Sequence, residues 1–336
     1  MIKNISVFLS AFLATLMDSG DIYIVALATP IIMTSTGASI LSASWVATGY
    51  IVALTVFAPL SGWLSALLTR RIFFLLSILT FVLFSVGCSL STSIGVLIFF
   101  RILQGVSGAG IHPISQSLVI DLFPAKKRAL GSVLYGFSPL MAPVIGPIVA
   151  GYILSVSTWN SLFLINLPVG ILILLLAFFS VDLNTVSNNK KTKKIDIPGL
   201  FFVISGLSSL LIGITNGRNW GWYSPQILLL ILIGLLLVLF FVFWELKSDN
   251  PVIDFKKLKS KPILICSILM FNIGFLFISL AFILPIFLSV AVGLPSSSLS
   301  QVYFLSAAVL TVVLFFTGTI LKNVDPRIFI MFGSIC

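Results

Sequence analysis

The stretch Ser161–Val181 has the sequence SLFLINLPVGILILLLAFFSV, in which no side chain is ionisable. An α-helix rises about 1.5 Å per residue, so a stretch of this length reaches across a hydrocarbon core of roughly 30 Å. The run is also too long for a typical buried strand. We therefore predict a membrane-spanning helix at Ser161–Val181.

Apolar runs of similar length recur along the chain and predict ten complete membrane-spanning helices. An eleventh apolar segment starts near Pro326 and reaches only Cys336, so we expect the chain to end inside a membrane segment. The first run is longer than a signal peptide's apolar part, and we expect it to be retained. The other nine predicted spans are Ile5–Ile32, Ser44–Leu68, Ile72–Leu90, Ile94–Leu122, Ala129–Val156, Ile197–Thr215, Pro225–Leu246, Pro262–Val292 and Gln301–Leu321.

The composition excludes a soluble protein. Hydrophobic residues make up 59% of the chain and charged residues 8%, whereas soluble domains have roughly 45–50% and about 25%. So few charges cannot cover a surface that faces water, so lipid must be the main solvent. The three cysteines, Cys88, Cys266 and Cys336, lack the spacing of a metal or redox site, and we interpret them as packing residues.

The positive charges indicate how the chain is oriented. With a cytoplasmic N-terminus and alternating loops, all of the 19 Lys and Arg residues except Arg101 and Arg218 fall in cytoplasmic segments. This asymmetry follows the positive-inside rule and supports the helix count. It also indicates that the net charge of +10 interacts with a membrane surface and not with nucleic acid. We predict a multi-pass protein of the cell membrane.

Two long cytoplasmic loops, Asp182–Asp196 and Lys247–Lys261, predict the domain organisation. The predicted fold is all-α, with an N-terminal six-helix bundle at residues 1–182 and a linker with two transmembrane helices at 183–261. An incomplete C-terminal bundle at 262–336 would hold two full helices and a stub. Six helices commonly form a pair of inverted three-helix repeats in secondary transporters.

Four ionisable residues lie deep inside predicted spans: Asp18, Asp21, Arg101 and His112. Such residues are costly in lipid and mark functional sites by default. Asp21 lies about 16 Å and Arg101 about 9 Å from the outer ends of their helices, so the two can form an ion pair. The pair is either a carboxylate that binds protons or cationic substrate, tuned by Arg101, or a static lock between helices. A second carboxylate, Asp18, on the same helix face favours function.

The run Ile94–Leu122 carries a stripe of polar or small residues at steps of three and four: Arg101, Gln104, Gly108, His112 and Ser115. A stripe of this kind cannot be satisfied by lipid, so we expect it to face a cavity or another helix. Within it, His112 is either a proton relay or a neutral histidine that is hydrogen-bonded to a neighbouring helix.

Prolines and small residues recur at steps of four in the run Ala129–Val156. The prolines remove backbone hydrogen bonds and predict a bent helix, while the small residues allow close helix packing. The run is either a moving interface or an ordinary packed membrane helix. The residues concerned are Pro139, Pro143 and Pro147, with Gly136, Ala142, Gly146, Ala150 and Gly151.

The sequence lacks the motifs of soluble enzymes. It has one histidine, no cluster of His and Cys that predicts a metal site, and no glycine-rich phosphate loop. A membrane enzyme would need clustered His or acidic residues at the membrane–water boundary, and these are missing too. We therefore expect no cofactor, no bound metal and no covalent catalysis.

Several motifs together resemble the major facilitator superfamily, and in particular its fourteen-helix drug:proton antiporters of the EmrB/QacA type. The stretch Leu97–Gly108 (LIFFRILQGVSG) is similar to the family motif lxxxRxxqGxg, and Gly146–Gly151 (GPIVAG) resembles the antiporter motif GPxxGG. Trp159–Gly170 (WNSLFLINLPVG) is similar to WrwiFliNvPiG, and Asp21–Pro30 (DIYIVALATP) to DxTIVNVALP. The Trp220–Trp222 turn and residues 251–254 (PVID) also resemble this subfamily.

The resemblance implies roles for individual residues. Asp21 takes the acidic place of the first motif, and Arg101 takes the arginine that the family uses in proton coupling, with Gln104 beside it in the same motif. Gly105, Gly146, Pro147 and Gly151 fall in the motifs linked to conformational change, as do Gly62, Arg70 and Arg71 in a loop that is similar to GxLaDrxGrk. That loop has Ala66 where the family has Asp and Thr69 where it has Gly, which weakens the expected cytoplasmic lock.

The implied function is proton-coupled efflux of hydrophobic or cationic drugs and toxic compounds by alternating access. The expected partners are a small hydrophobic or cationic substrate, protons and the lipid bilayer, together with a periplasmic adaptor protein where the source is Gram-negative; no nucleic acid is expected. The alternative is a non-transporting remnant of such a transporter, which assembles with another membrane chain.

Overall fold

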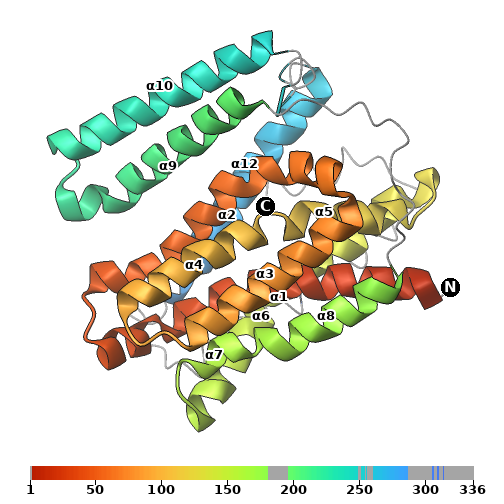
Figure 1. Ribbon diagram of the computed structural model, residues 1–336, viewed down its shortest axis with the longest axis horizontal. Helices are drawn as coiled ribbons and strands as arrows, with labels where there is room; N and C mark the ends of the chain where they lie inside the picture. Colours follow the sequence, from red (N-terminus) through yellow and green to blue (C-terminus); the bar gives the residue numbers. More distant parts are fainter. Residues whose placement is uncertain are drawn as a thin grey trace.

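A computed structural model describes residues 2–180, 196–248, 251–253, 255 and 260–286, together with residues 305, 309 and 313. Every element in these ranges is helical (Figure 1). The elements are α1 (Ile2–Thr36), α2 (Ile40–Leu68), α3 (Arg70–Ser89), α4 (Ile94–Gly108), α5 (Ile111–Asp121), η1 (Ala125–Lys127), α6 (Arg128–Val156), α7 (Ser161–Leu164), α8 (Asn166–Ser180), α9 (Ile197–Trp220), α10 (Pro225–Lys247) and α12 (Lys261–Ile286).

Within the described residues, eight helical segments are long and apolar enough to cross a membrane. They correspond to the first eight predicted spans and confirm an all-α, multi-pass architecture. The predicted span Pro262–Val292 is described as α12 as far as Ile286. The predicted span Gln301–Leu321 falls almost wholly outside the described residues, and the segment from Pro326 lies entirely outside them. The division at residues 182 and 261 therefore stays a prediction.

Two predicted spans are interrupted, which apolarity alone did not indicate. The run Ile94–Leu122 is divided into α4 and α5 at residues 109–110, and Ser161–Val181 into α7 and α8 at Ile165. A proline follows each break by three residues, at Pro113 and at Pro168. Proline has no N–H, so the carbonyl four residues earlier loses its helical hydrogen bond. The chain still continues in one direction, since Ile165 keeps helical angles (φ −61°, ψ −29°).

Helix α1 is the central element of the bundle formed by α1 to α8. It packs against α2, α5, α6 and α8, while α4 packs between α2 and α3. Figure 1 shows α9 and α10 as an antiparallel hairpin beside this bundle, and α9 contacts it through α2. Polar side chains on α1 are consequently surrounded by protein, as charges inside a membrane require.

The periodicity of burial on α3 shows how the bundle is stabilised. Phe74, Ile78 and Phe81 are fully buried, at steps of three and four residues, whereas Leu79 and Leu83 on the opposite face are exposed. An apolar side chain that points outward meets lipid and carries no penalty there. The outward face is therefore apolar as well, and the hydrophobic pattern alone cannot distinguish the two faces.

The small residues of α6 lie against α1. Ala142, Gly146 and Ala150 are buried, and a Cβ placed on Gly146 would lie 3.0 Å from the Tyr23 Cβ and 3.2 Å from the Gly20 carbonyl oxygen. This confirms the predicted face of close packing. Helix α6 continues through all three of its prolines, from Arg128 to Val156.

Candidate functional site

Arg101 is the centre of a buried polar network, and its side chain is fully shielded from solvent. Its guanidinium forms an ion pair with the Asp21 carboxylate of α1. The Nε donates to the Val46 carbonyl of α2 over 3.0 Å. The guanidinium also lies over the ring of Tyr50, 4.2 Å from its centroid, and this cation–π contact adds stabilisation. Arg101 thus joins α1, α2 and α4.

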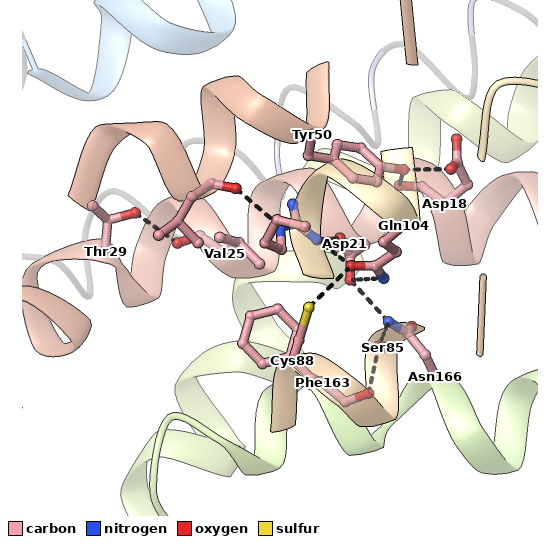
Figure 2. A network of polar contacts seen from close by, with 12 residues as sticks. Asp18, Asp21, Val25, Thr29, Tyr50, Ser85, Cys88, Gln104, Phe163 and Asn166 are labelled. Carbon is pink, nitrogen blue, oxygen red and sulfur yellow. Dashed lines mark hydrogen bonds and ion pairs between the residues drawn. The ribbon is translucent and has the colours of Figure 1, made fainter. Parts of the chain in front are cut away.

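Asp21 accepts hydrogen bonds from three side chains of the bundle, those of Arg101, Gln104 and Asn166 (Figure 2). Besides Arg101, the Asn166 Nδ2 of α8 donates to Oδ1 over 2.8 Å, and the Gln104 Nε2 donates to the same oxygen over 3.3 Å. The Gln104 Oε1 in turn accepts from Arg101 over 2.7 Å. Both carboxylate oxygens of Asp21 therefore accept hydrogen bonds, Oδ2 from Arg101 and Oδ1 from the two amides.

The network continues from Asn166 into α3 and α7. The Asn166 Nδ2 also lies within 2.9 Å of the Ser85 Oγ, and the Ser85 hydroxyl donates to the Phe163 carbonyl over 2.9 Å. The Cys88 thiol donates to the Gln104 Oε1 over 3.7 Å. These contacts connect Asp21 and Arg101 to both sides of the break between α7 and α8 at Ile165.

Asp18 has different partners, although it lies on the same helix face as Asp21. The Tyr50 hydroxyl donates to its Oδ1. Gly108 of α4 lies directly against that oxygen, because a Cβ at this position would be 2.5 Å from it. The other oxygen, Oδ2, is 3.1 Å from the Nε2 of His112, with the two groups not aligned as a hydrogen bond. Asp18 itself is fully buried.

His112 lies in the first turn of α5 between α1 and α6. Its Nε2 is 3.1 Å from the Ser19 Oγ, and its Nδ1 is 3.3 Å from the Tyr135 hydroxyl. That hydroxyl donates to the His112 carbonyl over 3.0 Å and accepts from the Thr15 hydroxyl over 3.1 Å. The imidazole side chain is 36% exposed, in contrast to Asp18. His112 therefore lies beside Asp18, the carboxylate that is not part of the family motif.

The predicted stripe on α4 and α5 is directed inward, as expected. Arg101, Gln104, Gly108 and Ser115 are buried and His112 is partly buried. Gly105 supports close approach of α4 to α2, since a Cβ there would lie 2.3 Å from the Tyr50 carbonyl oxygen.

The remaining predicted motif residues lie away from this network. Gly62 and Gly151 are exposed with nothing within 4 Å of an added Cβ, and Pro147 is half-buried beside the α1–α6 contact. Arg70 forms an exposed ion pair with Asp121 at the start of α3. The Arg71 guanidinium donates to the Phe178 carbonyl and lies 5.3 Å from the Phe178 ring centroid.

Four network residues were not selected by the charge-based reasoning: Tyr50, Ser85, Tyr135 and Asn166. A signal existed for Asn166, which is a polar amide inside an otherwise apolar span and part of a motif quoted above. The hydroxyl residues gave none, because Ser and Tyr are common in membrane helices. Only the packing of their helices shows which carboxylate they meet.

The described residues contain no group of three or more His, Cys, Asp or Glu side chains that could hold a metal ion. Cys88 is a buried free thiol and Cys266 an exposed one, while Cys336 lies outside the described residues. The site is therefore a network of two carboxylates, one guanidinium and one imidazole. Its available chemistry is binding and release of protons or cations.

A comparison with known families matches the model described as Major Facilitator Superfamily to residues 7–336. The chain belongs to the Major Facilitator Superfamily. The curated relatives found here are described as export and resistance proteins and not as enzymes, as the sequence analysis expected. The protein is accordingly a multi-pass membrane protein of this superfamily.

Curated relatives of this superfamily protein include multidrug exporters. The multidrug export protein EmrB of Escherichia coli (strain K12) is 34% identical over 273 residues, which are 81% of this chain and 51% of EmrB. The probable multidrug resistance protein EmrY of the same strain is 35% identical over 277 residues, or 81% of this chain and 53% of EmrY. The chain thus spans about half the length of the curated relatives it matches.

The fold is also found among solved structures. The human organic anion transporter MFSD10 (TETRAN) aligns with a TM-score of 0.61 over 96% of this chain and 74% of that one. The two sequences are 16% identical, so this similarity concerns the fold alone.

Proposed function

We propose that this protein exports hydrophobic or cationic compounds in exchange for protons, by alternating access. The observation that carries the proposal is the fully buried ion pair of Asp21 and Arg101 at the contact of α1 and α4. The similarity to multidrug exporters supports the class of substrate. Ionisable pairs inside membrane bundles characteristically mark proton or substrate pathways.

The proposed coupling follows from the charge balance at Asp21. Protonation neutralises the carboxylate and leaves the buried guanidinium of Arg101 without its counter-ion. An uncompensated buried charge is strongly unfavourable, so proton uptake favours an arrangement in which Arg101 is hydrated or paired elsewhere. A cationic substrate near Asp21 competes with the proton for the same carboxylate. Such competition couples export to proton entry.

The other residues of the candidate site have supporting roles in this proposal. Gln104 accepts from Arg101 and donates to Asp21, so it holds both members of the ion pair. Asp18 and His112 add a second titratable pair at the inner face of α1. Gly105 and Gly146 permit close helix contacts that can slide. Gly62, Arg70, Arg71, Pro147 and Gly151 are assigned to the conformational motifs by resemblance.

The proposed location is the cell membrane with the N-terminus in the cytoplasm, in contact with lipid on all outer faces. A periplasmic adaptor protein is a proposed partner where the source is Gram-negative, and no interaction with nucleic acid is proposed. The distribution of cations among the loops supports this orientation. In this orientation 17 of the 19 cations lie on the cytoplasmic side and one, Arg218, lies outside, as the positive-inside rule leads one to expect.

The test uses the purified chain in liposomes with an imposed pH gradient and a fluorescent cationic dye. We expect dye movement that depends on the gradient, is lost in Asp21→Asn and is partly restored in Asp21→Glu. Asparagine matches aspartate in shape and cannot titrate, whereas glutamate keeps the carboxylate. Gel filtration and thermal unfolding of each variant check that it is folded.

The possible results separate the alternatives. If Asp21→Asn transports dye with an unchanged gradient dependence, the carboxylate mechanism is wrong. If the unaltered chain moves no dye, transport by this chain is contradicted and the alternative of a non-transporting component is favoured. Co-purification of another membrane chain would then identify the assembly.

A further inference from the structure

Two electrically distinct centres share the inner face of α1. Asp21 is paired with a permanent cation, Arg101, and accepts further hydrogen bonds from two amides. Asp18 has the Tyr50 hydroxyl on one oxygen, and the other oxygen is buried without a hydrogen-bond donor, 3.1 Å from the His112 Nε2. The buried charge of Asp18 is therefore compensated only if the imidazole or the carboxyl group carries an additional proton.

We propose that Asp18 and His112 form a second proton-binding site, which holds one proton between the carboxylate Oδ2 and the imidazole Nε2. The proton enters and leaves through the exposed edge of the imidazole ring. The existence of this site follows from local geometry alone. Its use in transport rests on the function proposed above.

The contact between Oδ2 and Nε2 requires a proton. Both atoms are acceptors when the carboxyl group is ionised and this nitrogen is unprotonated. The two atoms are 3.1 Å apart without the alignment of a hydrogen bond, and at this distance a negative oxygen and an unprotonated nitrogen repel each other. Burial strengthens the repulsion. One proton on either atom turns the repulsion into an attraction.

The opposite side of the ring needs a proton as well. The single hydroxyl proton of Tyr135 is donated to the His112 carbonyl, and the Thr15 hydroxyl donates to the Tyr135 oxygen. The Tyr135 oxygen is then an acceptor toward Nδ1 at 3.3 Å, so Nδ1 must be the donor. The pair of side chains therefore carries two protons, one on Nδ1 and one in the Oδ2–Nε2 contact. An ionised aspartate beside a neutral histidine would carry only one.

The position of the ring provides a route for that proton. Asp18 is fully buried, whereas the His112 side chain is 36% exposed. Water at the exposed edge can deliver a proton to the ring or accept one from it, and the imidazole connects this edge to the buried carboxylate. Loss of the proton leaves one of the two ring contacts without its hydrogen, so His112 or Tyr135 must move. Proton release therefore acts on the contact between α5 and α6.

Within the described residues no hydrogen-bond donor reaches Asp18 Oδ2, and the Ser19 hydroxyl faces the imidazole Nε2 instead, at 3.1 Å. Arg101 on α4 is committed to Asp21, and the Tyr50 hydroxyl of α2 already donates to the other Asp18 oxygen. From α6, Tyr135 faces the far nitrogen of the ring. Gly108 brings the backbone of α4 against Asp18 and contributes no charge. The carboxylate thus depends on His112 for its compensation.

The chain contains a single histidine, which allows a direct test. The full chain, labelled with ¹⁵N-histidine and reconstituted in nanodiscs, is titrated between about pH 5 and 9 while the ring nitrogen signals are followed by NMR. These signals distinguish a doubly protonated ring from the two neutral tautomers. Three proteins are compared: the unaltered chain, Asp18→Asn and Ser19→Ala. Ser19 contacts the same nitrogen as Asp18 but carries no charge.

We expect the ring nitrogen signals of the unaltered chain to change across this pH range, and we expect Asp18→Asn to alter this dependence on pH because it removes the adjacent carboxylate. Ser19→Ala should leave the dependence as it is in the unaltered chain. Ring signals that do not change with pH, or equal shifts in the two variants, would overturn the proposal and indicate an ordinary structural hydrogen bond.

The same measurement separates this proposal from the proposed function. If the unaltered chain moves no dye in liposomes, the transport function fails, but the histidine titration still decides whether Asp18 and His112 bind a proton. If dye movement is present, His112→Asn should change its dependence on pH. An unchanged dependence would remove the site from transport even when the NMR titration is as expected.

Discussion

The contact of α4 with α2 at Gly105 makes a sharp prediction about stability. A Cβ at this position would lie 2.3 Å from the Tyr50 carbonyl oxygen and 3.0 Å from the Ala53 Cβ. The first of these atoms belongs to the backbone of α2 and cannot rotate away. Gly105→Ala therefore forces the two helices apart, although alanine is the better helix former.

The magnitude can be worked out from the distances. Ordinary van der Waals contact begins at 3.4 Å, so α4 must withdraw by about 1 Å, and overpacking of this kind costs about 1–3 kcal/mol. Arg101 lies one turn earlier on the same face, and its 3.0 Å hydrogen bond to Val46 is stretched by the same displacement. Loss of a hydrogen bond to a charged group destabilises the bundle by a further ~1.5–3 kcal/mol. The higher helix propensity of alanine offsets up to ~1 kcal/mol of this destabilisation. We expect a net destabilisation of about 1.5–5 kcal/mol.

A buried thiol provides the assay. Cys88 is fully buried within the network, so a fluorogenic maleimide reacts with it only when the bundle opens. In a background with Cys266→Ser and Cys336→Ser, heating should expose Cys88 in Gly105→Ala at a temperature lower by several degrees. The matched control is Gly151→Ala, where an added Cβ meets nothing within 4 Å. It should unfold no earlier than the unaltered chain.

Comparing the two alanine variants tests whether α4 and α2 are in close contact at Gly105. If Gly105→Ala and Gly151→Ala expose Cys88 at the same temperature, then α4 and α2 are not in close contact at Gly105. The position of Arg101 relative to Val46 would then have to be revised.

Three further predictions concern the network, the surface and the orientation. Asn166→Leu removes a donor from Asp21 and a buried amide, and should lower the thermal stability by about 1–3 kcal/mol; an unchanged Cys88 reaction temperature would contradict the contact. Arg70→Gln breaks an exposed ion pair and should cost about 1 kcal/mol or less, with the difference vanishing at high salt. With the native cysteines replaced, a cysteine at Asn219 should react with an impermeant thiol reagent in intact cells and one at Ala125 should not; the reverse result would invert the proposed orientation.

Much of the helical architecture followed from local composition. A span such as Ser161–Val181 is apolar along most of its length, and in lipid a helix is the one local structure that satisfies every backbone group within the segment. The interruption at Ile165 was accessible from Pro168, since a missing N–H is a covalent property of the residue. It was not predicted because proline is tolerated in membrane helices.

The candidate site was only partly accessible. Asp21 and Arg101 were selected because ionisable side chains in lipid are expensive, and their depths allowed pairing. Depth along two helices does not specify rotation about their axes, so the roles of Asn166 and Tyr50 required the packed structure. The separation of Asp18 from the arginine likewise depends on Gly108 and on the start of α5.

The sequence by itself determined that this protein spans a membrane repeatedly, that it resembles drug:proton antiporters and that Asp18, Asp21, Arg101 and His112 lie deep inside its membrane spans. These are properties of single segments, which the 3.6-residue period and the apolar composition express directly. Tertiary structure alone decided which charges meet. Asp21 and Arg101 are separated by 80 residues, and Asp21 and Asn166 by 145. Contacts over such separations depend on how helices rotate and pack, and in lipid the outward face is as apolar as the inward one, so no local pattern records that rotation.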